Sequence, residues 1–193
     1  MHASEHLRLY LVRHARTALN ADGRLRGRLD PALDDVGRAE AAALATVIAA
    51  LRPARIVSSP LRRAWETAAA IADPAGLPVL VAAGLIDRDY GPWAGDTEDA
   101  VIAQFGDLDL APGVEPAYAV IKRARAVLDE QSEFLGAGPV VMVSHDAVNR
   151  LLLTDLASDL GGAGQLRQRT ACWNVLSVVD GRWTVERVDE KVE

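Results

Sequence analysis

Short apolar segments alternate along this chain with longer amphipathic segments, and this alternation limits the possible folds more than any other feature. LRLYLV (7–12) and RIVSS (55–59) are apolar runs bounded by polar residues, which is typical of buried strands. Between them, residues 34–52 are rich in alanine and contain no proline, so they predict a helix that ends before Pro53. Strands separated by helices pair in parallel. We therefore expect an α/β fold, a three-layer α/β/α sandwich with a mostly parallel central sheet.

The rest of the chain continues this pattern. Pro60 is expected at the first position of a helix over 61–72, with Ser59 as its N-cap. The other predicted elements are strands at 77–86 and 138–146, a helix at 115–135, a short helix at 97–105, a helix after Asp146, and a closing hairpin of 172–180 and 182–188 around Asp180–Gly181. The chain contains no linker-like or low-complexity stretch. It predicts one domain, 1–193, with a loop-like lid at about 87–116.

Composition restricts the function classes. The net charge is −6, and a general nucleic-acid binder would show a basic field that this chain lacks. A single cysteine permits no intramolecular disulfide and fits a reducing compartment. No segment has the length and apolar character of a signal peptide or a membrane span. We expect a cytoplasmic protein with no nucleic-acid or membrane partner. Arginines nevertheless crowd the first forty residues, which predicts a local anion site.

Polar residues follow several predicted strands directly. They are Arg13 and His14 after 7–12, Ser58 and Ser59 in the second strand, Asp87 and Arg88 after 77–86, and Ser144 and His145 in a later strand. Ligands of such sheets bind at the carboxyl ends of strands, where one crevice could collect all of these residues. Arginine forks match phosphate oxygens, and a neutral imidazole can attack phosphorus. Nearby guanidinium groups would keep more of that imidazole neutral, and a carboxyl group such as Asp87 would protonate the leaving oxygen.

Five sequence blocks resemble one family in the same order. LVRHARTALN (11–20) resembles the R-H-G-E-T-x-x-N signature of the histidine phosphatase superfamily, the phosphoglycerate-mutase-like enzymes. The other matching blocks are GRLDPALDDVGRAEA (27–41), SSPLRRAWETA (58–68), LIDRDYGPWAG (85–95) and VVMVSHDAV (140–148). The resemblance covers nearly the whole chain and implies a phosphoglycerate-mutase-like fold.

The resemblance also implies roles for individual residues. His14 would be the nucleophile that becomes a phosphohistidine, and His145 would be the second histidine of the site. Asp87 would be the proton donor, where the family usually has glutamate, whose side chain is one methylene longer. The implied phosphate ligands are Arg13, Asn20 and Arg63, and the expected substrate-rim residues are Arg16, Arg88 and Trp93. No metal or cofactor is implied, and a homodimer is compatible with the family.

Three residues depart from the family pattern. Ala15 replaces a glycine, Arg16 replaces a glutamate, and Asp146 replaces the glycine after the second histidine. A carboxylate at position 146 would repel phosphate, unless it turns away to cap the following helix, which is the interpretation we favour.

Three functions fit these residues. The first is a metal-independent phosphomonoesterase that acts on a small phosphorylated metabolite through a phosphohistidine. The second is a phosphoglycerate mutase, and the third is a non-catalytic module that binds a phosphorylated ligand. Between Asp87 and Pro116 the chain has eight acidic residues and only Arg88 as a cation, which should repel a bisphosphate. This charge favours the phosphatase and a leaving group that is neutral, polar or cationic.

Overall fold

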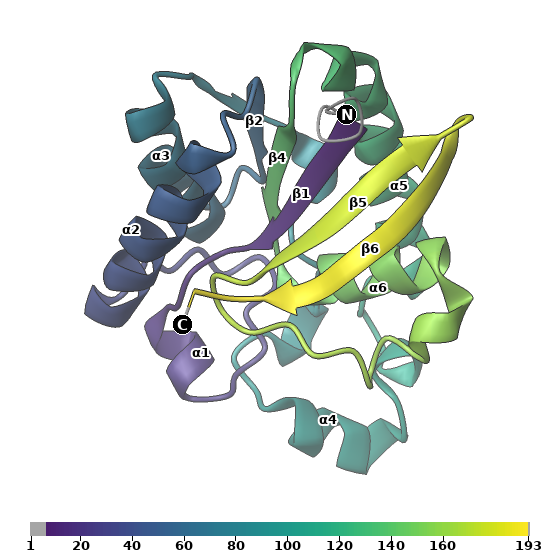
Figure 1. Ribbon diagram of the computed structural model, residues 1–193. Helices are drawn as coiled ribbons and strands as arrows, with labels where there is room; N and C mark the ends of the chain where they lie inside the picture. Colours follow the sequence, from purple (N-terminus) through teal and green to yellow (C-terminus); the bar gives the residue numbers. More distant parts are fainter. Residues whose placement is uncertain (1–6, 193) are drawn as a thin grey trace.

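The computed structural model describes residues 7–192, and its centre is a six-stranded sheet with the order β3-β2-β4-β1-β5-β6 (Figure 1). The parallel strands are β1 (Arg8–Arg13), β2 (Arg55–Ser58), β3 (Val79–Val81) and β4 (Val140–Ser144). The antiparallel strands are β5 (Trp173–Val179) and β6 (Arg182–Glu190), which complete the sheet beside β1. The expected mostly parallel α/β architecture is confirmed.

Helices cover both faces of the sheet (Figure 1). The longer helices are α2 (Asp35–Ala50) and α3 (Arg62–Ala75) on one face and α5 (Ala117–Gln131) and α6 (Asp146–Leu156) on the other. Two short helices, α1 (Ala18–Ala21) and α4 (Glu98–Phe105), lie in the connections. Within residues 7–192, no helix has the length and apolar character needed to cross a membrane.

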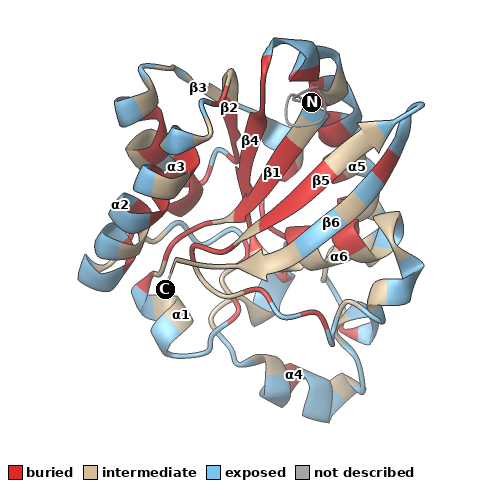
Figure 2. Cartoon of the chain, in the orientation of Figure 1, coloured by how far each residue is buried: buried red, intermediate tan, exposed pale blue. Residues whose placement is uncertain are grey.

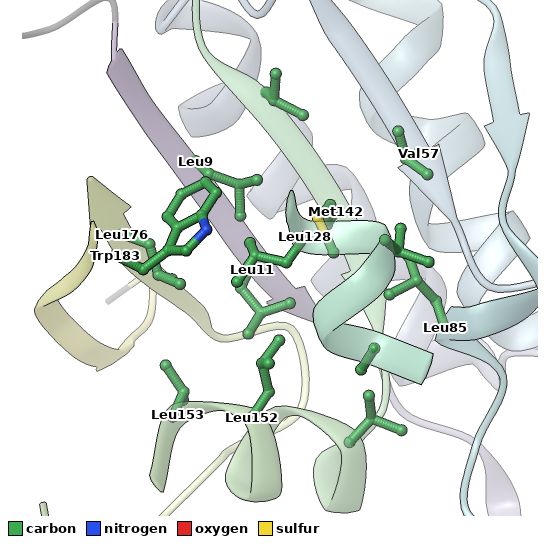
Figure 3. Close-up of a cluster of buried hydrophobic side chains, with 14 of the residues drawn as sticks. Leu9, Leu11, Val57, Leu85, Leu128, Met142, Leu152, Leu153, Leu176 and Trp183 are labelled. Atoms are coloured by element: carbon green, nitrogen blue, oxygen red, sulfur yellow. The ribbon is translucent and has the colours of Figure 1, made fainter. Parts of the chain in front are cut away.

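Alternate residues of β1 enter two separate hydrophobic clusters. Leu9 and Leu11 pack with side chains of α5 and α6, as Figure 3 shows. Tyr10 and Val12 belong to the cluster formed with α2 and α3. Because successive side chains of a strand point to opposite faces, a central strand must be apolar at every position, and β1 is buried throughout its middle (Figure 2).

Several predicted boundaries differ from the structure. In the segment 77–86, which is predicted as a strand plus an extension, the strand is β3 and the extension contains a 3₁₀ helix at Ala83–Leu85. The predicted helix 115–135 ends as a 3₁₀ helix at Ser132–Ala137. The hairpin is confirmed, since Asp180 and Gly181 have φ values of 50° and 73°, as a tight two-residue turn requires.

Both predicted side-chain caps are wrong. Leu61, two residues after Ser59, is the N-cap residue of α3, and the Ser59 hydroxyl accepts from the backbone N–H of Leu61 (3.3 Å) and is also hydrogen-bonded to His145 (2.7 Å). His145 is the N-cap residue of α6, so Asp146 is already inside the helix and its carboxylate pairs with arginines. Both helices therefore begin one or two residues away from the predicted positions, and both side chains have partners from distant parts of the chain.

Candidate active site

The carboxyl ends of three neighbouring strands bring the two histidines together. β4 lies between β2 and β1, with Arg13 in register with Ser144 and Ser58 in register with Val143. The residues that follow these strands therefore converge. The rings of His14 and His145 lie 5.2 Å apart between centroids, and neither side chain is exposed.

Hydrogen bonds fix the tautomer of His14. Its Nδ1 lies 2.7 Å from the carbonyl oxygen of Ala15 and must donate to it. Its Nε2 lies 3.3 Å from Nε of Arg63, which has only a proton to give. Nε2 therefore holds a lone pair, as a nucleophilic nitrogen requires.

Both histidines are held in the neutral form. Burial lowers the pKa of His14 well below its usual value, and the positive charge of Arg63 lowers this pKa further. Burial also lowers the pKa of His145, again with help from Arg63 and then from Arg26. A neutral imidazole at position 14 can act as a nucleophile near neutral pH.

Arg63 is the centre of the hydrogen-bond network. It is completely buried, and its guanidinium donates to the carbonyl oxygens of Leu29 (2.7 Å) and Gly27 (3.0 Å) and to Oδ2 of Asp87 (2.8 Å). The neighbouring Arg62 is exposed, with 62% of its side-chain surface accessible. Arg63 is therefore the arginine of this pair that lies in the candidate site.

Asp87 reaches the same cluster in spite of its shorter side chain. It is 2% exposed, its Oδ1 accepts from the backbone N–H of Arg88 (2.9 Å), and its Oδ2 lies 3.7 Å from Nδ1 of His145. The Nε2 atom of His145 lies 2.7 Å from the hydroxyl of Ser59. Within the described chain, Nδ1 of His145 is buried without a hydrogen-bond partner.

The other two predicted phosphate ligands also present buried N–H groups without an acceptor. Oδ1 of Asn20 accepts from the backbone N–H (3.0 Å) and the hydroxyl (2.8 Å) of Thr17, while its Nδ2 has no partner among residues 7–192. Arg13 donates through Nη1 to Asp146 and Gln168, and its Nε is likewise unpaired. An unsatisfied buried donor costs roughly 1–3 kcal/mol, so such groups are expected where an anion binds.

A cleft with a volume of about 290 Å³ adjoins this cluster. Its charged lining residues are Arg88, Glu98, Asp107, Asp109, Asp146 and Arg150. Asp146 connects the cleft to the cluster because it lines the cleft, follows His145 and binds Arg13. Both arginines of the cleft are paired with carboxylates, Arg88 with Asp109 and Arg150 with Asp146.

The three predicted rim residues have different surroundings. Arg88 lines the cleft, and its Nε donates to the carbonyl oxygen of Glu115 (2.8 Å). Arg16 instead pairs with Asp34 (3.0 Å). Trp93 packs against a phenylalanine of the lid, and its Nε1 donates to the carbonyl oxygen of Pro112 (2.9 Å). Arg16 and Trp93 are not among the residues that line the cleft, so a rim role gains no support for either of them.

Sequence reasoning gave too little weight to Arg26 and Glu40. The Nε atom of Arg26 is buried without a partner in the described part of the chain, and the charge of Arg26 acts on both histidines. Its place in the arginine-rich first forty residues was the available signal. Glu40 accepts from the backbone N–H of Arg16 (3.0 Å) and from the side chains of Thr170 (2.8 Å) and Lys191 (2.9 Å), and so fixes the loop after His14.

The replacement of glycine by Ala15 is accommodated without backbone strain. Ala15 is fully buried, does not adopt a positive φ, and donates its N–H to the hydroxyl of Thr67 (3.0 Å). No group of three or more His, Cys, Asp or Glu side chains in residues 7–192 is arranged to hold a metal ion.

The fold and the site define a class of α/β protein in which two neutral histidines meet several arginines at the carboxyl edge of the sheet. The chain belongs to the histidine phosphatase superfamily, branch 1, whose family model matches residues 9–191. It is 34% identical over 200 residues to glucosyl-3-phosphoglycerate phosphatase of Mycobacterium tuberculosis, with 91% of this chain and 86% of the relative covered. It is 31% identical over 157 residues to phosphoserine phosphatase 1 of Hydrogenobacter thermophilus, with 76% and 74% covered.

Solved structures agree with this assignment. The structure of mycobacterial glucosyl-3-phosphoglycerate phosphatase with VO3 matches with a TM-score of 0.83 and 32% identity, covering 95% of this chain and 99% of that one. Phosphoglycerate mutase from Bacillus anthracis has the same fold, with a TM-score of 0.86 at 24% identity and coverage of 95% and 93%. The expected phosphoglycerate-mutase-like fold is confirmed.

Proposed function

We propose that this protein is a metal-independent phosphomonoesterase that hydrolyses a small phosphorylated metabolite through a phosphohistidine on His14. The observation that carries the proposal is the lone pair on Nε2 of His14, since Nδ1 donates to the carbonyl oxygen of Ala15. Unpaired N–H donors of Arg13 and Asn20 are available for the phosphoryl oxygens. The named activities of the relatives belong to the same reaction class.

In the first step, the phosphoryl oxygens bind Arg13, Asn20 and Arg63. Nε2 of His14 attacks phosphorus, the new P–N bond forms, and the ester P–O bond breaks. The leaving oxygen takes a proton from the carboxyl group of Asp87 and departs as an alcohol. A phosphoryl dianion on Arg63 would compete with the carboxyl group of Asp87 for the guanidinium.

In the second step, a water molecule attacks the phosphorus of the phosphohistidine. Its proton passes to the carboxylate of Asp87 while the P–N bond breaks, which releases inorganic phosphate and restores neutral His14. Fixed arginine charges stabilise the transferring group in both steps, so catalysis depends on positioning and charge. Because neither histidine is exposed, covering side chains must move before a phosphoryl group reaches His14.

The charges of the cleft favour a hydrolase over a mutase. Glu98 and Asp107 line the cleft without an ion pair among the described residues, whereas both cleft arginines are neutralised by carboxylates. A second phosphate, which a mutase must hold, would find no free cation there. The leaving group of the substrate is therefore neutral, polar or cationic.

The first test is hydrolysis of p-nitrophenyl phosphate with EDTA present, by the wild type and by His14→Ala. The wild type should turn over, and the variant should lose activity while its thermal unfolding shows a folded protein. Mass spectrometry at alkaline pH after quenching should find a phosphoryl group on the peptide that contains His14. A folded His14→Ala variant with most of its activity would refute the mechanism.

A second arm tests the reaction class and the substrate. The wild type is assayed for interconversion of 3-phosphoglycerate and for hydrolysis of phosphoserine, glucosyl-3-phosphoglycerate and a sugar bisphosphate. We expect hydrolysis without interconversion and a lower rate on the bisphosphate. Preference for the bisphosphate would contradict the charge argument while leaving the role of His14 intact.

A further inference from the structure

A carboxylate lies beside the phosphoryl site at a position where the superfamily motif has glycine. Asp146 directly follows His145, as the first residue of α6, and only 14% of its side chain is exposed. A carboxylate so close to the predicted phosphate ligands would repel a phosphoryl group if it were unpaired. Its contacts indicate why it can remain there.

Asp146 bridges two arginines. Its Oδ1 accepts from Nη1 of Arg13 (3.2 Å), a residue on β1, 133 positions earlier in the chain. Its Oδ2 accepts from Nη2 of Arg150, one turn further along α6. Each carboxylate oxygen therefore has its own cation, and the pair Arg150–Asp146 fixes the direction in which Oδ1 points.

The bridge restricts the orientation of Arg13. Nη1 of Arg13 also donates to the carbonyl oxygen of Gln168, so this nitrogen is held by two acceptors. The guanidinium group is planar and rigid, so holding Nη1 also fixes the direction of Nε, which is buried and unpaired in the described chain. Burial lowers the pKa of Arg13, and the charge of Asp146 acts in the opposite direction.

We propose that Asp146 is a positioning residue for Arg13, holding its guanidinium by Nη1 so that Nε remains free for a phosphoryl oxygen. Arg150 keeps Asp146 in place from the side of the cleft. This inference rests on the proposed function, because it assigns Arg13 to the phosphoryl group.

A double-mutant cycle tests the proposal with p-nitrophenyl phosphate as substrate and vanadate as inhibitor. Asp146→Ala removes both acceptor oxygens and should lower kcat/KM about 10- to 100-fold, with a comparable weakening of vanadate inhibition. Asp146→Asn keeps an acceptor oxygen for Arg13 and should stay within roughly three-fold of the wild type. In an Arg13→Ala background, Asp146→Ala should cause no further loss, because the partner through which it acts is absent.

Asp155→Ala is the matched control, since Asp155 lies on the same helix, is partly exposed, and pairs with Arg125 far from the histidines. Equal losses of kcat/KM in Asp146→Asn and Asp146→Ala would overturn the proposal. The negative charge of Asp146 would then explain both losses, and its placement of the Arg13 guanidinium would not. A full further loss from Asp146→Ala in the Arg13→Ala background would overturn it too.

If Asp146→Ala does not fold, Asp146→Ser replaces it in the cycle, because serine keeps a polar side chain at the first position of α6 but is too short to reach Arg13. Activity of the His14→Ala variant reports on the proposed function independently. Failure of the positioning role and failure of the phosphohistidine mechanism are therefore distinguishable.

Discussion

Gly37, in the first turn of α2, should be essential for the placement of His14 although it contacts no substrate group. A Cβ atom at this position would lie 1.9 Å from the carbonyl oxygen of Arg16 and 2.8 Å from its carbonyl carbon. Both are backbone atoms, so no side-chain rotation can relieve the overlap. We expect Gly37→Ala to push α2 and the loop after His14 apart by roughly 1 Å.

The cost of this displacement can be worked out from the same contacts. Overpacking of a close-packed interior costs about 1–3 kcal/mol, and the better helix propensity of alanine returns less than about 1 kcal/mol. A net loss of about 2 kcal/mol lowers Tm by roughly 4–8 °C in a chain of this size. The displaced loop includes Ala15, whose carbonyl oxygen accepts from His14, so kcat should fall about 10- to 100-fold as well.

Thermal unfolding and p-nitrophenyl phosphate hydrolysis measure the two effects. Gly136→Ala is the matched control, because its Cβ would meet no atom within 4 Å and its φ lies outside the left-handed region. This control should change stability by no more than about 0.5 kcal/mol. A Gly37→Ala variant with wild-type Tm would refute the packing argument, and one with lower Tm but unchanged kcat would refute the link to His14.

Three further predictions follow from the buried charges. Below pH 6.5, their usual pKa, both histidines bind protons in the unfolded chain but stay neutral in the folded chain. As the pH is lowered from about 7 to about 5, the free energy of unfolding should therefore decrease by up to about 1.4 kcal/mol per pH unit for each histidine. Urea denaturation would measure this slope, which should be smaller in His145→Asn. A steeper or unchanged slope in that variant would contradict the assignment. Arg63→Ala leaves Asp87 buried without its cation and should cost about 3–5 kcal/mol in chemical denaturation, against about 0.5 kcal/mol or less for the exposed control Arg62→Ala. Asp87→Asn should slow alkyl phosphate hydrolysis about 100-fold or more but affect p-nitrophenyl phosphate far less, and equal losses on both substrates would exclude a proton-donor role.

The sequence predicts the framework of the site because the relevant signals are local. A run of apolar residues that ends in Arg13 and His14 indicates a central strand with its carboxyl end at the ligand edge, and the structure has both features. The resemblance of the block 58–68 to the family pattern assigns the phosphate contact to Arg63, and in the structure Arg63 is buried while its neighbour Arg62 is exposed.

The sequence could not predict which side chains meet across the fold. Arg16 is predicted as a rim cation, and the sequence does not indicate its ion pair with Asp34. Asp146 looked like a helix cap, but its carboxylate has a stronger partner in Arg13, which lies 133 positions away and becomes a neighbour only when β1 and β4 pair. Local capping rules fail here because α6 begins one residue earlier than the cap prediction requires, with His145 as its N-cap residue, and the Asp146 carboxylate then pairs with two arginines.

The balance of charge explains how one cluster can both activate His14 and bind phosphate. The buried or half-buried cations near the histidines are Arg13, Arg26 and Arg63, and the carboxylates paired within the cluster are Asp87 and Asp146. Burial first, and then the excess positive charge, lowers the pKa of both imidazoles and keeps them neutral, which preserves the lone pair on His14. A phosphoryl dianion reverses this balance. In the proposed mechanism, the negative charge would raise the proton affinity of His145, whose Nδ1 has no partner in the described chain, when a donor to the phosphoryl group is useful. In the proposed mechanism, the same arginines thus protect the nucleophile in the free enzyme and stabilise the transferring group once it has bound.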